Sequence, residues 1–321
     1  MSHESMLSKG THLLSRLLTS SEARRRIPRA VWRAAKGPEP VFLDYPIDPR
    51  PRYGYGLPPH PELYALIDSN RSVYMDMLRS LERYAAQLSA IRQREDDAAT
   101  EPHWRNGYIP GLDALTLYCF AAMNDPSLYV EIGSGNSTKF VRRSITDNHL
   151  HTKIVSIDPT PRAEIDSICD EVIREPLENL DFALFDRLGA GDILVFDGSH
   201  MVFQNSDATA FFLEIMPRLA SGVMVYVDDI FLPYDYPPEW RERFYSEQYI
   251  LGALLLGDEM NRYEVTFPNV FIDSDEELSQ IASALCERIG LERKPGNLKG
   301  PHGRSGTGMW LRIRERGKAG R

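Results

Sequence analysis

The stretch Leu128-Tyr-Val-Glu-Ile-Gly-Ser-Gly-Asn-Ser-Thr-Lys-Phe140 predicts how the chain around it folds. Residues 128–132 form a short apolar run rich in β-branched and aromatic residues, which is typical of a buried strand. Gly133 and Gly135 interrupt this run, and glycine permits backbone angles and close approaches that a Cβ forbids. Asn136 and the two residues after it are good helix caps. A strand, a glycine turn and a helix N-terminus together place free backbone N–H groups beside a nucleotide-like ligand.

After residue 128 the chain alternates between short apolar runs and helical patterns. Strands are predicted over 128–132, 153–157, 171–174, 192–196, 222–227, 263–266 and 308–313. Helical segments are predicted over 162–169, 180–188, 206–219, 241–256 and 276–289. This alternation indicates an α/β fold with a mostly parallel, doubly wound, Rossmann-like sheet. In such sheets, ligands bind at the carboxyl ends of the strands.

Composition describes a globular chain. Of the 321 residues, 42% are hydrophobic and 26% are charged. No run reaches the ~18 apolar residues of a membrane span, and the beginning lacks a secretory-type apolar segment, so we expect a cytoplasmic protein. Cys119, Cys169 and Cys286 are widely spaced, which argues against a disulfide framework or a thiolate metal site.

Charge is unevenly distributed along the chain. The net charge is −9, but residues 1–36 carry eight Lys and Arg against two Glu, which leaves −15 for the rest. Because the body is acidic, we expect no nucleic-acid binding. We expect a basic N-terminal arm over 1–36, either solvated or touching an anionic membrane or partner. A Pro- and Tyr-rich arm with a helical cap (37–125), the main domain (126–315) and a disordered tail (316–321) would follow.

Several predicted strands end in acidic residues, among them Glu131 and Asp158. Asp158 follows Gly135 by 23 residues. This spacing is close to the ~20-residue offset at which an acid binds the two hydroxyls of a ribose. The alternative is that Asp158 only forms a turn before Pro159.

Asp197 and the pair Asp228-Asp229 follow two strands that would be neighbours in the sheet. Three converging carboxylates are costly unless a positive charge compensates them, and an oxygen-only set suits Mg²⁺. Without a metal, Asp229 would cap a turn and Asp197 would face a hydroxyl or water. His200 lies at the same rim and is a candidate general base, since its ordinary pKa suits deprotonation of a hydroxyl near neutral pH.

Four segments, in this order and spacing, resemble the class I S-adenosylmethionine-dependent methyltransferases. The likeness covers about residues 105–315 and is closest to a branch labelled methyltransferase domain 24, related to sugar, macrolide and catechol-type O-methyltransferases. The segments are Val-Glu-Ile-Gly-Ser-Gly-Asn-Ser (130–137), Ser-Ile-Asp-Pro (156–159), Ile-Leu-Val-Phe-Asp-Gly-Ser-His (193–200) and Tyr-Val-Asp-Asp-Ile-Phe (226–231).

The resemblance implies seven strands with an antiparallel last strand, an N-terminal helical extension and S-adenosylmethionine as cofactor. Cofactor contacts would come from Glu131, Gly133, Ser134, Gly135, Asn136, Ser137, Asp158, Asp197, Gly198 and Ser199. In metal-dependent members, residues at the positions of Asp197, Asp228 and Asp229 bind Mg²⁺, although Asp228-Asp229 stands where His-Asp is expected. Catalysis would fall to His200, Asp197 and Asp229. The substrate walls would be 104–108 and 231–240.

We therefore expect a methyltransferase that modifies a small-molecule hydroxyl, such as that of a sugar or natural product, with or without Mg²⁺, and as a monomer or homo-oligomer. One alternative is a non-catalytic cofactor-binding or scaffold protein with the same fold. Another is a nicotinamide-dependent oxidoreductase. The second is disfavoured because Thr138 occupies the position of the third glycine in the Gly-x-Gly-x-x-Gly pattern.

Overall fold

The computed structural model of the protein describes residue 45 and residues 47–94, 100–291 and 306–315. The chain divides into two units, Met1–Asp48 and Pro49–Arg321, and the second is described below. The predicted basic arm and the C-terminal tail lie outside the described residues. No helix within the described ranges is both long and apolar enough to span a membrane.

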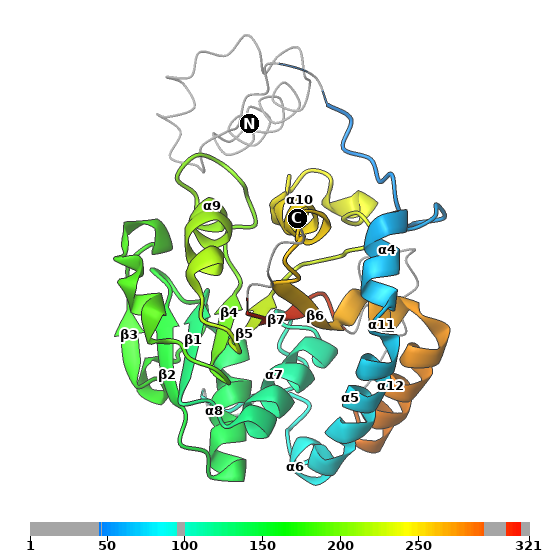
Figure 1. Cartoon of the computed structure of the whole chain (residues 1–321). Coiled ribbons are helices and arrows are strands. Elements are labelled where there is room, and N and C mark those ends of the chain that lie inside the picture. Colours follow the sequence, from blue (N-terminus) through cyan, green and yellow to red (C-terminus); the bar gives the residue numbers. More distant parts are fainter. Residues whose placement is uncertain (1–44, 46, 95–99, 292–305, 316–321) are drawn as a thin grey trace, which may run out of the picture. The chain divides into compact units, whose positions relative to one another are not determined.

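The core of the second unit is one seven-stranded sheet with the order β3-β2-β1-β4-β5-β7-β6 (Figure 1). Strands β1 to β5 run parallel, and β7 is antiparallel to both β5 and β6. This confirms the predicted fold class. The strands are β1 (Leu128–Ile132), β2 (Lys153–Ile157), β3 (Glu171–Ile173), β4 (Ile193–Phe196), β5 (Met224–Val227), β6 (Tyr263–Pro268) and β7 (Met309–Ile313).

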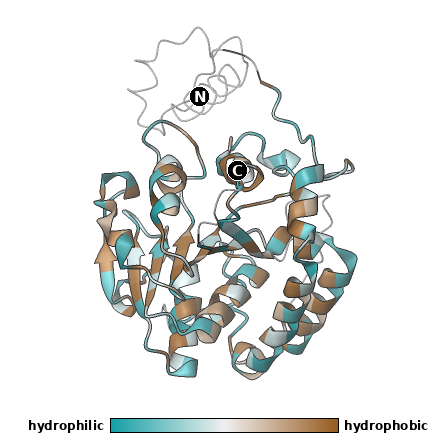
Figure 2. Ribbon diagram, in the orientation of Figure 1, coloured by the Kyte–Doolittle hydropathy of each residue, from teal (hydrophilic) through white to brown (hydrophobic). Residues whose placement is uncertain are grey.

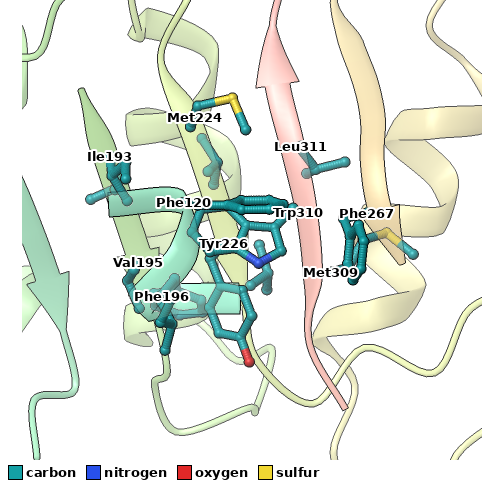
Figure 3. Close-up of a cluster of buried hydrophobic side chains, with 14 of the residues drawn as sticks. Phe120, Ile193, Val195, Phe196, Met224, Tyr226, Phe267, Met309, Trp310 and Leu311 are labelled. Carbon is teal, nitrogen blue, oxygen red and sulfur yellow. The ribbon is translucent and has the colours of Figure 1, made fainter. Parts of the chain in front are cut away.

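Apolar side chains bury both faces of the central strands, which explains their continuous rather than alternating hydrophobicity. Figure 2 shows brown residues along these strands and mixed colours on the helices. On one face, Tyr226 and Trp310 are paired across β5 and β7 and pack under Phe120 (Figure 3). On the other face, Phe196 stacks on Phe211 with ring centroids 4.1 Å apart. The sheet is thus a rigid platform for the loops at its edge.

The helices are α4 (Pro61–Asp68), α5 (Arg71–Leu81), α6 (Ala85–Ser89), α7 (Gly111–Asn124), α8 (Asn136–Asn148), α9 (Asp207–Ala210), α10 (Glu247–Leu256), α11 (Asn269–Ser274) and α12 (Glu276–Arg288). Helix α7 packs against α8, and α5 packs against α12. Arg71 on α5 makes a bidentate ion pair with Asp275, the N-cap of α12, at 2.8 and 2.7 Å. This pair fastens the N-terminal helices to the C-terminal part of the fold.

Four predicted helical segments are shorter or more broken than expected. Segments 162–169 and 180–188 contain only the 3₁₀ turns Asp166–Ile168 and Phe182–Arg187. In 206–219 the helix passes through a π-helical turn, Phe211–Ile215, before Pro217. The helix predicted from 241 begins at Glu247, because Phe244 has a positive φ of 56° that interrupts a right-handed helix. Helix α11 was not predicted.

Residues before α4 contact the loop that follows β5. The carboxylate of Asp235 accepts hydrogen bonds from the backbone N–H groups of Arg52 (2.6 Å) and Tyr53 (3.0 Å). The His60 N–H donates to the carbonyl of Pro233 at 2.9 Å. The proline- and tyrosine-rich segment therefore braces a loop that borders the site described next.

Candidate active site

A cavity of about 980 Å³ lies at the carboxyl ends of β1, β2, β4 and β5. This is the edge at which open α/β sheets bind ligands, and the volume is near the upper end of the ~300–1,000 Å³ of small-molecule sites. The predicted cofactor residues that line it are Gly133, Ser134, Gly135, Asn136, Ser137, Asp158, Asp197, Gly198 and Ser199, and His200, Asp228 and Asp229 line it as well.

The glycine turn is shaped by the close approach of two loops. Gly133 has a φ of 80°, and its N–H donates to the carbonyl of Ile157 at 2.9 Å. A Cβ at Gly133 would lie 1.7 Å from the backbone oxygen of Asp197, so only glycine fits. Gly135 differs, since an added Cβ would meet no atom within 4 Å. Gly135 thus presents bare backbone to the cavity, at the N-terminus of α8.

Glu131 is the predicted cofactor residue that does not line the cavity. It is fully buried below the turn, where one carboxylate oxygen accepts a 2.5 Å hydrogen bond from Thr138. Its other oxygen is buried without a hydrogen-bond partner among the described residues. Burial raises the pKa of Glu131 to about 7, although hydrogen bonds from Ser137 and Thr138 oppose the shift.

Asp158 lines the cavity and also forms a turn. One carboxylate oxygen accepts a hydrogen bond from the N–H of Thr160 at 2.7 Å. The other accepts none within the described residues. The turn-forming alternative and the ligand-facing prediction are therefore compatible, because the turn uses only one of the two carboxylate oxygens.

Asp207 fixes the loop that follows β4. Its carboxylate accepts hydrogen bonds from the Ser199 N–H at 2.6 Å and from the Ser199 hydroxyl at 2.5 Å. A Cβ at Gly198 would lie 2.6 Å from both Asp207 and Phe196. The side chain of Asp197 remains 44% exposed, so it is available to a ligand.

His200 is the most heavily partnered side chain of the site. Its Nδ1 lies 2.5 Å from Glu247 Oε1, and its Nε2 lies 3.4 Å from Asp197 Oδ1 and 3.7 Å from Asp229 Oδ2. Burial lowers the pKa of His200, but Glu247, Asp197 and Asp229 together outweigh burial and raise this pKa to about 12. The imidazole is therefore positively charged at neutral pH, which does not favour the predicted role of general base.

Glu247 is not among the site residues predicted from the sequence. It begins α10, is fully buried, and its second carboxylate oxygen has no hydrogen-bond partner among the described residues. It stands 47 residues from His200 in the chain. Its one sequence signal is a glutamate at the start of an apolar helix, which by itself indicates only favourable charge at a helix N-terminus.

Asp228 and Asp229 face different partners. Asp228 Oδ1 accepts a hydrogen bond from the Tyr226 hydroxyl at 2.8 Å, and this hydroxyl points away from the apolar cluster in Figure 3. Asp229 has a left-handed backbone, φ 51°, and faces His200. Burial raises the pKa of Asp229 to about 6 against the opposing charge of His200, and burial beside other acids raises the pKa of Asp228.

The predicted magnesium ligands do not fit a metal. Within the described parts of the chain, no three His, Cys, Asp or Glu side chains are arranged to hold an ion. His200 lies between Asp197 and Asp229 and supplies the positive charge that sequence reasoning assigned to Mg²⁺. Asp228 is turned toward Tyr226 instead of toward this pair.

The loop after β5 forms an aromatic wall. Phe231, Trp240 and Tyr245 line the cavity, whereas Tyr234 and Tyr236 are buried in packing with their neighbours. Gln248 on α10 holds this loop by accepting from the Phe231 N–H at 2.8 Å. Of the predicted wall 104–108, Gly107 and Tyr108 line the cavity, while Trp104 is buried against Phe140.

Residues 130–230 match a family model described as a methyltransferase domain, which spans the glycine turn, Asp158, Asp197, His200 and the Asp228-Asp229 pair. This part of the chain matches a methyltransferase domain, as the four sequence segments predicted. The strand order of the whole sheet, with its antiparallel β7, agrees with the fold that the resemblance implied.

Solved structures of other methyltransferases are similar in arrangement. The plantazolicin methyltransferase BpumL, solved with S-adenosylhomocysteine, is 14% identical; the match covers 75% of this chain and 99% of that one, with a TM-score of 0.39. The Podospora anserina methyltransferase PaMTH1 is also 14% identical, over 77% and 95% of the two chains, with a TM-score of 0.33. No curated protein sequence matches the chain.

At the glycine turn, the cavity has the features that would suit S-adenosylmethionine. Gly135 leaves space beside the first N–H groups of α8, and Asp158 lines the same cavity. The N–H groups at the start of α8 can donate hydrogen bonds to a carboxylate, and the Asp158 carboxylate can accept them from the two hydroxyls of a ribose.

Proposed function

We propose that the chain transfers a methyl group from S-adenosylmethionine to a hydroxyl oxygen of a small molecule, without a metal ion. The observation that carries this proposal is that a single cavity joins the glycine turn and Asp158 to the cluster of His200, Asp197 and Asp229. The end of the cavity at the glycine turn suits a nucleoside cofactor. The end at His200 offers one positive and two acidic side chains to the molecule that accepts the methyl group.

The cofactor, when bound, supplies a methyl group on a positively charged sulfur. The residues that would hold it are the turn from Gly133 to Ser137 and the carboxylate of Asp158. Ser199, which Asp207 fixes, lies on the opposite side of the glycine turn from Asp158, after the neighbouring strand β4. Methyl transfer depends mainly on alignment of two reactants, so a turn defined by glycine geometry is well suited to this task.

His200 would act as a fixed positive charge. Glu247 holds Nδ1, so the ring has one orientation, and Nε2 carries its proton toward Asp197 and Asp229. A hydroxyl placed at Nε2 would lose its proton more easily, because a nearby cation stabilises the developing oxyanion. This is the electrostatic task that a metal performs in metal-dependent enzymes.

Asp229 would receive the proton of the hydroxyl. Its carboxylate lines the cavity beside His200, and its pKa of about 6 is suited to a general base at neutral pH. Asp197 is the more exposed acid on the other side of His200 and would orient the acceptor. His200 and Asp229 both have a left-handed backbone, at φ 61° and 51°, and such conformations gather at functional sites.

The test is methyl transfer from isotopically methyl-labelled S-adenosylmethionine to a panel of hydroxylated and aminated small molecules. We expect label on oxygen, and loss of transfer in Asp229→Asn while binding of S-adenosylhomocysteine persists. Label found only on nitrogen would overturn the assignment of the acceptor atom. Full activity of Asp229→Asn would overturn its role as base.

A further inference from the structure

Arg243 borders the cavity on the side formed by the loop after β5. Its guanidinium lies 4.2 Å from the centroid of the Trp240 ring and 5.4 Å from that of Tyr245. The nearby Arg241 has an acidic neighbour, Glu242, at 3.9 Å. By contrast, no carboxylate in the described ranges forms an ion pair with Arg243.

Two aromatic rings thus hold a positively charged group in place without neutralising it. Stacking restrains the guanidinium and removes part of its hydration. Its Nη1 donates a hydrogen bond to the Tyr245 hydroxyl at 3.4 Å, and its remaining N–H groups donate to no other side chain among the described residues. A restrained guanidinium with such N–H groups is a good receptor for a planar carboxylate, since two parallel hydrogen bonds fit it.

Arg243 is also connected to the reacting end of the cavity through one side chain. The Tyr245 ring contacts both the guanidinium of Arg243 and the His200 ring, whose centroid lies 4.3 Å from that of Tyr245. The charge of Arg243 reaches Asp229, where it helps to lower the carboxyl pKa. A molecule that touched both His200 and Arg243 would therefore span about the width of one aromatic ring.

We propose that Arg243 binds a carboxylate of the methyl acceptor, so that the acceptors are small hydroxy acids. The hydroxyl would lie at His200 and Asp229, and the acid group would lie at Arg243. This inference rests on the proposed function for the position of the hydroxyl, but the carboxylate site can be tested by itself.

The experiment measures binding to the full chain loaded with S-adenosylhomocysteine. The probes are 3,4-dihydroxybenzoate, 3-hydroxybenzoate and mandelate, each paired with its neutral amide, and the readout is calorimetry. In the wild-type protein we expect at least one acid to bind about 10-fold or more tightly than its amide, as a charge-assisted hydrogen-bond pair requires. In Arg243→Gln this preference should vanish. Arg241→Gln, at a charge outside the cavity lining, is the matched control and should keep it.

Three results would overturn the inference. One is that no acid binds better than its amide to the wild-type protein, which includes the case that none binds. Another is that Arg243→Gln keeps the preference. The third is that Arg243→Gln loses S-adenosylhomocysteine itself, which would assign the guanidinium to the cofactor carboxylate. An Arg243-dependent preference for acids in a chain that methylates no oxygen would refute the proposed function alone.

Discussion

The Nδ1 atom of His200 lies 2.5 Å from Oε1 of Glu247, and both side chains are buried. This contact joins the loop after β4 to the first turn of α10. It fixes the orientation of the ring and decides its charge, because a buried carboxylate at this distance favours the imidazolium. The proposed chemistry depends on that positive charge.

We predict that Glu247→Gln converts His200 into an ordinary, largely neutral histidine at pH 7.5. Methyl transfer should fall about 10- to 100-fold, because the cation at the acceptor oxygen is lost. Nuclear magnetic resonance of the His200 ring should show its pKa falling from about 12 in the wild type toward the usual range near 6.5.

Glu259→Gln, at an exposed position just after α10, is the matched control and should leave both values unchanged. Because the folded-state pKa of His200 is raised, its contribution to stability is fully present below about pH 6.5 and is lost only as the pH rises through about 12. A His200 pKa that stays high in Glu247→Gln would contradict the assigned cause.

Two alanine substitutions in the glycine turn should separate an effect on stability from an effect on cofactor binding. Gly133→Ala forces a Cβ to within 1.7 Å of the Asp197 backbone oxygen, so we expect a loss of more than about 3 kcal/mol in the free energy of unfolding. Gly135→Ala meets no atom, and its φ of 176° is open to any residue. We expect it to fold normally but to lose affinity for S-adenosylhomocysteine, because the methyl group projects beside the cavity.

Denaturant unfolding and calorimetry on the same samples separate these two outcomes. A Gly135→Ala variant that binds as tightly as the wild type would show that no ligand approaches the turn at this residue.

Glu131 should make the protein less stable as the pH rises through the weakly acidic range. Its pKa is about 7 in the folded state and 4.5 in the reference state, so the folded protein binds the extra proton. Stability should therefore fall between about pH 4.5 and pH 7, by about 3 kcal/mol for this group. Glu131→Gln, which keeps an oxygen for Thr138, should make this slope smaller, while other buried acids with a raised pKa, such as Asp229, keep their own share of it. Urea unfolding at several pH values measures it, and an identical slope in both proteins would contradict the assigned burial.

Removal of divalent ions should leave methyl transfer unchanged. His200 already neutralises the space between Asp197 and Asp229, so neither EDTA nor added Mg²⁺ should alter the rate. The assay compares initial rates after exhaustive chelation with and without Mg²⁺ returned. Loss of activity in EDTA and its recovery with Mg²⁺ would restore the three-carboxylate metal site in place of the fixed imidazolium.

The sequence predicts best what depends on short, local patterns. The strand before Gly133, the turn itself and the acid at Asp158 are close together in the chain, and their geometry follows from backbone physics. The alternation of strands and helices likewise predicts the parallel sheet. The segments 162–169 and 180–188 were predicted less well, because one helical turn of apolar spacing does not distinguish an α-helix from a 3₁₀ turn.

The charge state of the site could not be predicted, because it depends on a distant residue. Asp197, Asp228 and Asp229 indicated a need for positive charge, and Mg²⁺ was one way to supply it. Only the fold brings Glu247 to His200, across 47 residues of chain. The roles of the aromatic residues after β5 could not be predicted for a similar reason. Tyr234 and Tyr236 belong to a small buried cluster, whereas the Trp240 ring packs against the guanidinium of Arg243.

The most direct test of cofactor binding at the glycine turn is a calorimetric titration of the purified chain with S-adenosylhomocysteine, repeated with Asp158→Asn and Asp158→Ala. We predict one bound molecule per wild-type chain, and a loss of about 1.5–3 kcal/mol in Asp158→Ala, as expected for hydrogen bonds to a charged group. Asp158→Asn can still accept from Thr160 and isolates the effect of the charge. No binding by the wild-type chain, or equal affinity in all three proteins, would contradict the placement of the cofactor at this turn.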